Sequence, residues 1–191
     1  MFSPSLPLYD YEVSRTQNDR LKARVTTDFA SVANLEAYQA YNENLLSEVL
    51  RTKKVDEPIF VSITFERPLS TDRARELTGV TQMDVLSYGV FGSKDNEVIS
   101  TYISPSSHDI EGVPHSDRLM GVTYDGIMNV QGIVNVHGLD KLSASMGDIA
   151  LIDLTANEIQ ANVGKATGEH IELEQIAVPS PAWQFYTGSR H

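Results

Sequence analysis

The side chains best suited to hold a metal lie between residues 104 and 129, a stretch rich in proline, glycine and acids. Imidazole and carboxylate groups together form zinc, manganese or iron sites. A loop of this length inside a domain is often functional, because most connections are shorter. The candidate ligands are His108, Asp109 and His115, with Glu111 and Asp117 beside them. Their spacing matches no standard motif, and acidic surface loops with a histidine or two are common, so the metal site is the less favoured interpretation.

A second polar group lies in VNVHGLDKLSASMGDIALIDLT, residues 134–155. Nucleophilic catalysis would need a serine within hydrogen-bond reach of the histidine and a third group that orients the ring. The local spacing provides neither arrangement. We therefore expect these side chains to lie at caps, corners and exposed faces of a scaffold: His137 at a strand-to-helix corner, Asp140 in a first helical turn, Ser143 and Ser145 in solvent, and Asp153 in a strand.

The sequence also lacks the common catalytic and ligand-binding motifs. The sequence has no GxSxG elbow, phosphate-binding glycine loop, HExxH pair or EF-hand loop. Two carboxylates on neighbouring strands would suit glycosidic chemistry, and such residues also occur as solvated rim groups. The acids on or beside the expected strands are Glu66, Asp84, Glu97 and Asp153.

Composition narrows the choice of partner. Among 191 residues, 26 are acidic and 15 are lysine or arginine, which gives a net charge of -11. Such a surface repels phosphate backbones and anionic headgroups, so we do not expect nucleic acid as a partner. The chain has no cysteine, which excludes disulfides and thiolate chemistry. No apolar run approaches the ~18 residues of a membrane span, so we expect a soluble chain, in the cytoplasm or as an extracytoplasmic ectodomain.

Hydrophobic periodicity divides the chain into regions. Residues 1–26 lack a clear period and predict an extended arm. Residues 27–54 predict a long amphipathic helix. Residues 55–165 predict an α+β domain, into which the 104–129 loop is inserted, and residues 166–191 form a C-terminal extension.

The expected helix over 27–54 begins with Thr27 or Asp28 as its cap. Its apolar residues recur every three or four positions: Phe29, Val32, Leu35, Tyr38, Tyr41, Leu45 and Val49, with Leu46 and Leu50 beside them. An apolar stripe at this spacing indicates a packing face, against the domain or against a partner helix.

Two stretches of the α+β region share one plan of strand, helix, glycine and strand. They are PIFVSITFERPLSTDRARELTG followed by DVLSYGVFG, and QGIVNVHGLDKLSASMG followed by DIALIDLT. In the first strand the period is two, which predicts one buried face. The turn SKDN joins hairpin strands at 84–92 and 97–103. This plan predicts a ferredoxin-like two-layer sandwich with an antiparallel sheet, preceded by the long helix.

The same pattern, over residues 59–154, resembles the propeptide or inhibitor domain of subtilisin-like serine proteases. In this likeness PIFVSITF is the first strand, and GLDKLSASMGDIALID is the second helix and last strand. The resemblance implies a ferredoxin-like fold and protease inhibition. The long helix, the 104–129 insertion and the residues after 154 depart from the pattern of the family.

The C-terminal tail is rich in aromatic residues, which either dock on the domain or bind a partner. They are Trp183, Phe185 and Tyr186. From these observations we expect a non-enzymatic interaction or regulatory domain, without a cofactor, that binds another protein or itself through a sheet edge or face, the long helix or the aromatic tail. The alternatives are a metal- or ligand-binding enzyme with its site under the 104–129 loop, and a protease-inhibiting domain.

Overall fold

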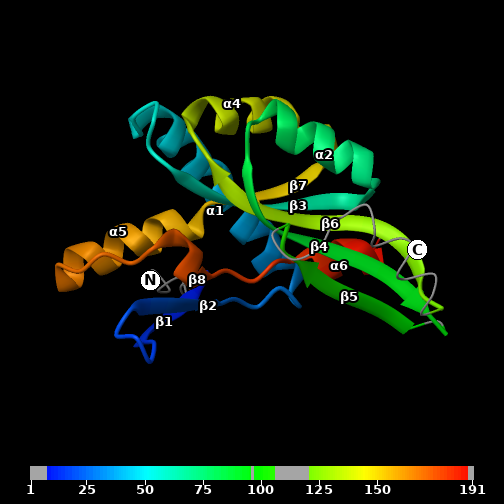
Figure 1. Cartoon of the computed structure of the whole chain (residues 1–191), viewed down its shortest axis with the longest axis horizontal. Coiled ribbons are helices and arrows are strands. Elements are labelled where there is room, and N and C mark those ends of the chain that lie inside the picture. The colour runs from blue at the N-terminus through cyan, green and yellow to red at the C-terminus, as the bar shows by residue number, and fades with distance from the viewer. Residues whose placement is uncertain (1–7, 96, 106–120, 189–191) are drawn as a thin grey trace, which may run out of the picture.

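Two β-sheets and the helices around them make up the part of the chain that a computed structural model describes, residues 8–95, 97–105 and 121–188 (Figure 1). The protein is α+β, as the sequence predicts. Its elements are β1 (Asp10–Arg15), β2 (Leu21–Thr26), α1 (Val32–Thr52), β3 (Ile59–Leu69), α2 (Thr71–Val80), β4 (Asp84–Lys94), β5 (Glu97–Ile103), β6 (Thr123–Val134), α4 (Val136–Ala144), β7 (Ile149–Asp153), α5 (Thr155–Thr167), β8 (Ile176–Ala177) and α6 (Ala182–Gly188).

The larger sheet has the strand order β5-β4-β6-β3-β7, and all its neighbouring strands are antiparallel. Helix α2 joins β3 to β4, and α4 joins β6 to β7, so each helix connects two parallel strands that are separated by one strand. Both helices cover the same face of the sheet (Figure 1). The predicted hairpin of β4 and β5 is confirmed, with Lys94 opposite Glu97. The predicted loop over 104–129 extends too far, because β6 begins at Thr123.

Strand β3 forms the centre of the core. Its residues Ile59, Val61, Ile63 and Phe65 are fully buried and pack with Leu139, Leu142 and the other apolar residues of α2 and α4. The prediction that β3 has one buried face is wrong, because Phe60, Ser62 and Thr64 on the opposite face are buried as well. Segments that are distant in sequence cover this second face. Phe60 packs with residues of α5 and the smaller sheet, and the Thr64 hydroxyl lies 3.0 Å from that of Ser180.

Short polar side chains begin the two crossover helices. Ser70 is the N-cap of α2 and accepts a hydrogen bond from the N–H of Arg73. Asn135 caps α4 through the N–H of Gly138, so Val136 is helical rather than part of the preceding strand. A Cβ at Gly138 would lie 2.4 Å from the carbonyl oxygen of Thr81. Glycine at this position therefore allows α4 to approach the end of α2.

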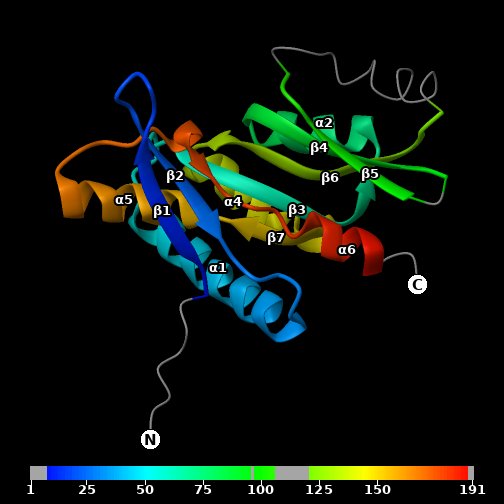
Figure 2. The same ribbon diagram turned by 90° about the horizontal axis from the view of Figure 1, so that it is seen from below.

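Helix α1 begins later than predicted, because Ser31 rather than Thr27 or Asp28 is its N-cap. Its buried residues are Tyr38, Asn42, Leu46 and Val49, a stripe that includes one amide. The helix lies along the outer edge of β7 (Figure 2). There the Gln39 amide donates to the carbonyl of Ala150 at 2.8 Å, and the Asn42 amide oxygen accepts from the N–H of Leu154 at 2.8 Å. Side chains of α1 thus satisfy one backbone carbonyl of β7 and the backbone N–H that follows the strand.

Part of the expected N-terminal arm is folded. Strands β1 and β2 form an antiparallel hairpin over residues 10–26, and Asp19 in its turn has a φ of 58°. Strand β2 also pairs in parallel with β8 from the C-terminal extension, which completes the three-stranded sheet. Apolar residues of β2, α5 and the extension form a second core, which includes Val25, Ile159 and Ile176.

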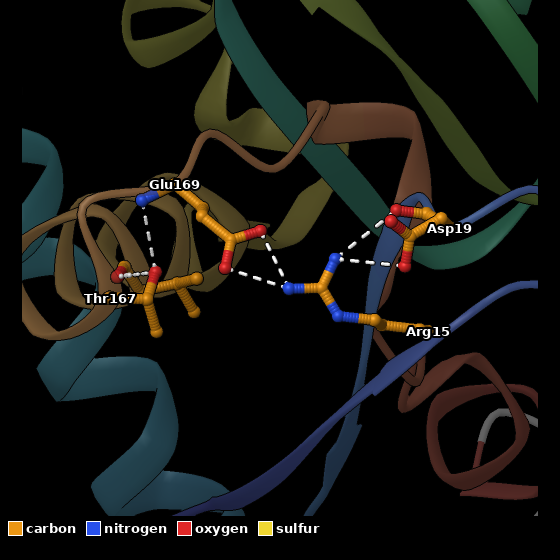
Figure 3. A network of polar contacts seen from close by, with 5 residues as sticks. Arg15, Asp19, Thr167 and Glu169 are labelled. Carbon is orange, nitrogen blue, oxygen red and sulfur yellow. Dashed lines mark hydrogen bonds and ion pairs between the residues drawn. The ribbon is translucent and has the colours of Figure 1, made fainter.

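An ion-pair network ties the hairpin to the end of α5 (Figure 3). One guanidinium nitrogen of Arg15 lies 2.7 and 2.8 Å from the two carboxylate oxygens of Glu169, and the other lies 3.2 Å from a carboxylate oxygen of Asp19. The Thr167 hydroxyl accepts from the N–H of Glu169. Gly168, between them, has a φ of 73° and ends the helix. Arg15 and its acids are largely exposed, so this network contributes little stability.

We predict that Asn42→Ala lowers the free energy of unfolding by about 1–3 kcal/mol, because it leaves the buried N–H of Leu154 without an acceptor. The matched control is Asn44→Ala on the exposed face of the same helix, which should change stability by about 0.5 kcal/mol or less. Urea unfolding of both variants measures the difference. Equal losses would show that α1 does not seal the β7 edge through Asn42.

Candidate functional site

The predicted metal ligands His108, Asp109 and His115 lie outside the described residues. Within the described ranges, no group of three or more histidine or acidic residues is arranged to hold a metal ion. The metal site in the 104–129 loop therefore stays a prediction.

Most polar residues of the stretch 134–155 lie on the surface of α4. His137 and Asp140 are exposed, and the hydroxyls of Ser143 and Ser145 donate to backbone carbonyls of their own helix at 2.8 and 2.9 Å. These hydroxyls are half-buried rather than fully in solvent. The arrangement is that of a helix surface.

Asp153 is the exception, because its carboxylate is buried at the end of β7 and not at an exposed face. The hydroxyl of Tyr38 lies 2.7 Å from one carboxylate oxygen and 2.8 Å from the hydroxyl of Thr155, while the N–H of Thr155 donates to the other oxygen. Burial raises the pKa of Asp153, although these hydrogen bonds oppose the shift. Burial also raises the pKa of Tyr38. Because all three side chains are sealed from solvent, they join α1, β7 and α5 rather than meet a substrate.

A second tyrosine and carboxylate cluster surrounds Glu158 at the start of α5. One oxygen of Glu158 accepts hydrogen bonds from the hydroxyls of Tyr9 and Tyr41. Burial and the bond to Glu158 raise the pKa of Tyr41 to about 12, and burial raises the pKa of Tyr9 as well. Both phenols therefore remain protonated donors near neutral pH. They fasten the segment before β1 and the helix α1 to α5.

An open cleft of about 450 Å³ lies beside Tyr9 and is lined by Leu8, Tyr9, Asp10, Thr26, Thr27, Asp28 and Asn34. The acids of this cleft form hydrogen bonds with nearby groups of the chain. The two carboxylate oxygens of Asp28 accept from the N–H of Ala30 and the amide of Asn34, and Asp10 accepts from the N–H of Tyr11. The acids that line the cleft are therefore engaged in local turns of the chain rather than available to a ligand.

The acids considered for glycosidic chemistry lie on four different strands. Glu66, Asp84 and Glu97 are exposed, and Asp153 is buried. Strands β6 and β3 separate Asp84 on β4 from Asp153 on β7, which at ~4.8 Å per strand is roughly 14 Å. Paired catalytic carboxylates lie within about 9.5 Å of one another. The sheet does not bring these two residues together.

The aromatic residues of the tail are divided between core and surface. Tyr186 is buried against Phe91 and Met128 on the second face of the sheet, where its hydroxyl donates to Asp125. Phe185 packs at the margin of this cluster. Trp183 is 44% exposed, with its ring centre 6.2 Å from that of Phe91. The expected partner-binding role of these residues stays a prediction, and Trp183 is the one that the surface presents most openly.

The edge strands β7, β1 and β5 differ in how they are protected from pairing with another strand. Helix α1 covers the β7 edge, and the exposed strand β1 carries charges at Asp10, Glu12 and Arg15. Among the described residues, no strand pairs with the outer edge of β5. Within β5 only Glu97, at its start, is charged, and the strand has no proline or lysine. Proteins usually protect such an edge with charges, proline or a covering element, so β5 differs from β7 and β1.

Apolar side chains are exposed along β5. Ile99 is 38% exposed on one face and Tyr102 is 54% exposed on the other. Tyr102 lies opposite Gly89, and an atom of its ring lies 3.3 Å from the position that a Cβ of this glycine would take. Because Phe91 is two residues from Gly89 on β4, Tyr102 and Trp183 lie on the same side of the sheet. The β5 surface, defined as β5 with Trp183, is therefore the candidate site.

Sequence reasoning expected an exposed sheet edge but did not identify which one. The signal is the run VISTYI, where β-branched and aromatic residues occupy both faces without a charge. This run is typical of a strand that either is covered or pairs further.

No family model, curated protein or solved structure matches this chain. The likeness to subtilisin propeptides stays a prediction. Among the described residues, no helix has the length and apolar character needed to cross a membrane.

The natural chain should lose stability as pH rises through the range in which Asp153 ionises. We predict that Asp153→Asn removes this loss. The raised pKa means that folded Asp153 binds its proton more tightly than the unfolded chain does. Its stabilising contribution is therefore full below the unfolded pKa near 3.9 and declines by about 1.4 kcal/mol per pH unit until the raised folded pKa is passed. Asparagine keeps an acceptor for Thr155 and donates to the Tyr38 oxygen, so it satisfies the network without the charge.

The measurement is urea unfolding of both proteins from about pH 4 to pH 8. The stability of Asp153→Asn relative to the natural chain should increase with pH. Asp140→Asn, which removes an exposed carboxylate from α4, is the control. Parallel pH profiles for the natural chain and Asp153→Asn would contradict the account.

Proposed function

We propose that this protein is a non-enzymatic interaction domain that binds a polypeptide by strand addition to β5. The observation that carries the proposal is the contrast between the two edges of one sheet. Side chains of α1 bond to the backbone at Ala150 in β7 and at Leu154 just after it, whereas no described strand pairs with the outer edge of β5, which carries one charge, Glu97. A partner strand would take its affinity from backbone hydrogen bonds and its specificity from side chains at alternate positions.

The fold that we propose for this domain is a ferredoxin-like sandwich with an added edge strand. Support comes from the order β4-β6-β3-β7 and from the two crossovers through α2 and α4, which together follow the βαββαβ plan. Strand β5 is then an addition beyond β4. An added strand that leaves an open edge, instead of ending the sheet with charges, is a feature that folding alone does not require.

The chemistry of the β5 surface indicates what it accepts. A seven-residue strand, Glu97–Ile103, can pair with an extended segment of similar length. On the side of α6, an added strand would meet Tyr102, and aromatic residues favour aromatic or β-branched neighbours across strands. The partner segment is therefore extended, free of proline and apolar at alternating positions.

The proposal predicts that a photo-reactive cross-linker placed at Ser100 forms adducts in the cells that produce the protein. Ile99→Lys in the same background should reduce the adduct about tenfold or more, because strand pairing would bury the lysine beside the junction.

The matched control is Val13→Lys on the outer strand β1, since Val13 is 40% exposed and Ile99 is 38% exposed. This control should leave the adduct unchanged. Circular dichroism verifies that each variant is folded. Absence of any adduct, or equal adducts in all variants, would refute the proposed role of β5.

A further inference from the structure

We infer that the partner of the β5 surface is a second copy of this chain, which forms a two-fold symmetric dimer through antiparallel β5–β5 pairing. This inference rests on the proposed function. Two identical edges that pair side by side in opposite directions are related by a two-fold axis perpendicular to the sheet. Such an axis keeps both copies with α2 and α4 on one face and α6 on the other, and it joins two five-stranded sheets into one.

Two-fold symmetry together with full overlap of the two β5 strands sets the register. Each residue faces a partner residue on the same side of the sheet, and full overlap of Glu97–Ile103 places Ser100 opposite the partner's Ser100. Val98 then faces the partner's Tyr102, and Ile99 faces the partner's Thr101. These are β-branched and aromatic pairs of the kind that stabilise antiparallel sheets.

The charges also suit this register. Glu97, the one charged residue of β5, faces the partner's Ile103 and not another acid. Like charges directly opposite one another would destabilise the pair, and this register has none within the strand. The most exposed large side chain of β5, Tyr102, would become covered by the partner's Val98.

A second β5 also needs less ordering than a flexible peptide does. It is already extended and hydrogen-bonded to β4 along its whole length. A disordered segment would lose chain entropy on binding, which weakens its net affinity. Opposing this, each copy has a net charge of -11, so the two repel at long range. Because salt screens this repulsion, the dimer should become tighter as ionic strength rises.

Cysteine cross-linking of the full-length chain tests the register, since the natural chain has no cysteine. Directly opposite residues on antiparallel strands have Cα atoms about 4.5–5.5 Å apart, within the range of a disulfide. Ser100→Cys should therefore form a disulfide-linked dimer under mild oxidation. Glu97→Cys, equally exposed on the same strand, would lie roughly 20 Å from its symmetry mate and should not.

Light scattering during size-exclusion chromatography measures the natural chain and Ile99→Lys, at protein concentrations up to about 100 μM, where weak dimers assemble. We expect a dimer fraction that increases with salt, and at least about a tenfold weaker association for Ile99→Lys. Val13→Lys should behave like the natural chain.

A natural chain that stays monomeric, or cross-linking as rapid at Glu97→Cys as at Ser100→Cys, would overturn the inference. If the chain is monomeric and the Ser100 cross-linker still gives an adduct that Ile99→Lys abolishes, the proposed function stands and the second copy is not its partner. If both results are negative, both proposals fail.

Discussion

Every β-sheet ends in a row of backbone N–H and C=O groups that need partners, and this constraint explains how the chain is arranged around its larger sheet. At β7, the sequence solves the problem with a 21-residue helix whose amides reach the strand backbone. At β5, the described residues provide no such cover. Among the described residues the sheet is therefore covered at β7 and uncovered at β5, and we interpret the β5 side as the functional one.

The closed side depends on polar groups that only tertiary contact can satisfy. Asn42 accepts from Leu154, and Tyr38 donates to Asp153, across 112 and 115 residues of sequence. Such buried groups stabilise the fold only when each is matched, since an unmatched one costs about 1–3 kcal/mol. Phe60 is held in the same way, because the Asn157 amide both accepts from its N–H and donates to its carbonyl. These contacts hold α1, β3, β7 and α5 in one arrangement. The polar residues that form them therefore stabilise the fold rather than contact a ligand.

Most features that depend on residues close in sequence were predicted, and features that depend on distant segments were not. The two strand-helix-strand stretches around α2 and α4 and the β4–β5 hairpin depend on neighbours in sequence, and they were predicted correctly. The β1–β2 hairpin was missed although its strands are close in sequence, because β1 has no buried face and β2 buries only Ala23 and Val25, in a core that α5 and the C-terminal extension complete. The burial of Asn42 and Asp153 was not predicted, because a polar residue is expected to be exposed unless its distant partner is known. The second buried face of β3 was missed for the same reason, since distant segments cover it.

The most direct test of this account is amide hydrogen exchange, measured residue by residue at several protein concentrations. The account predicts that Leu154, bonded to Asn42, is protected at every concentration, whereas the outward-facing amides of β5 exchange quickly in dilute protein and become protected as concentration rises. Protection of the β5 amides that equals that of Leu154 at the lowest concentration would show that the edge is already covered within a single chain, and would contradict the account.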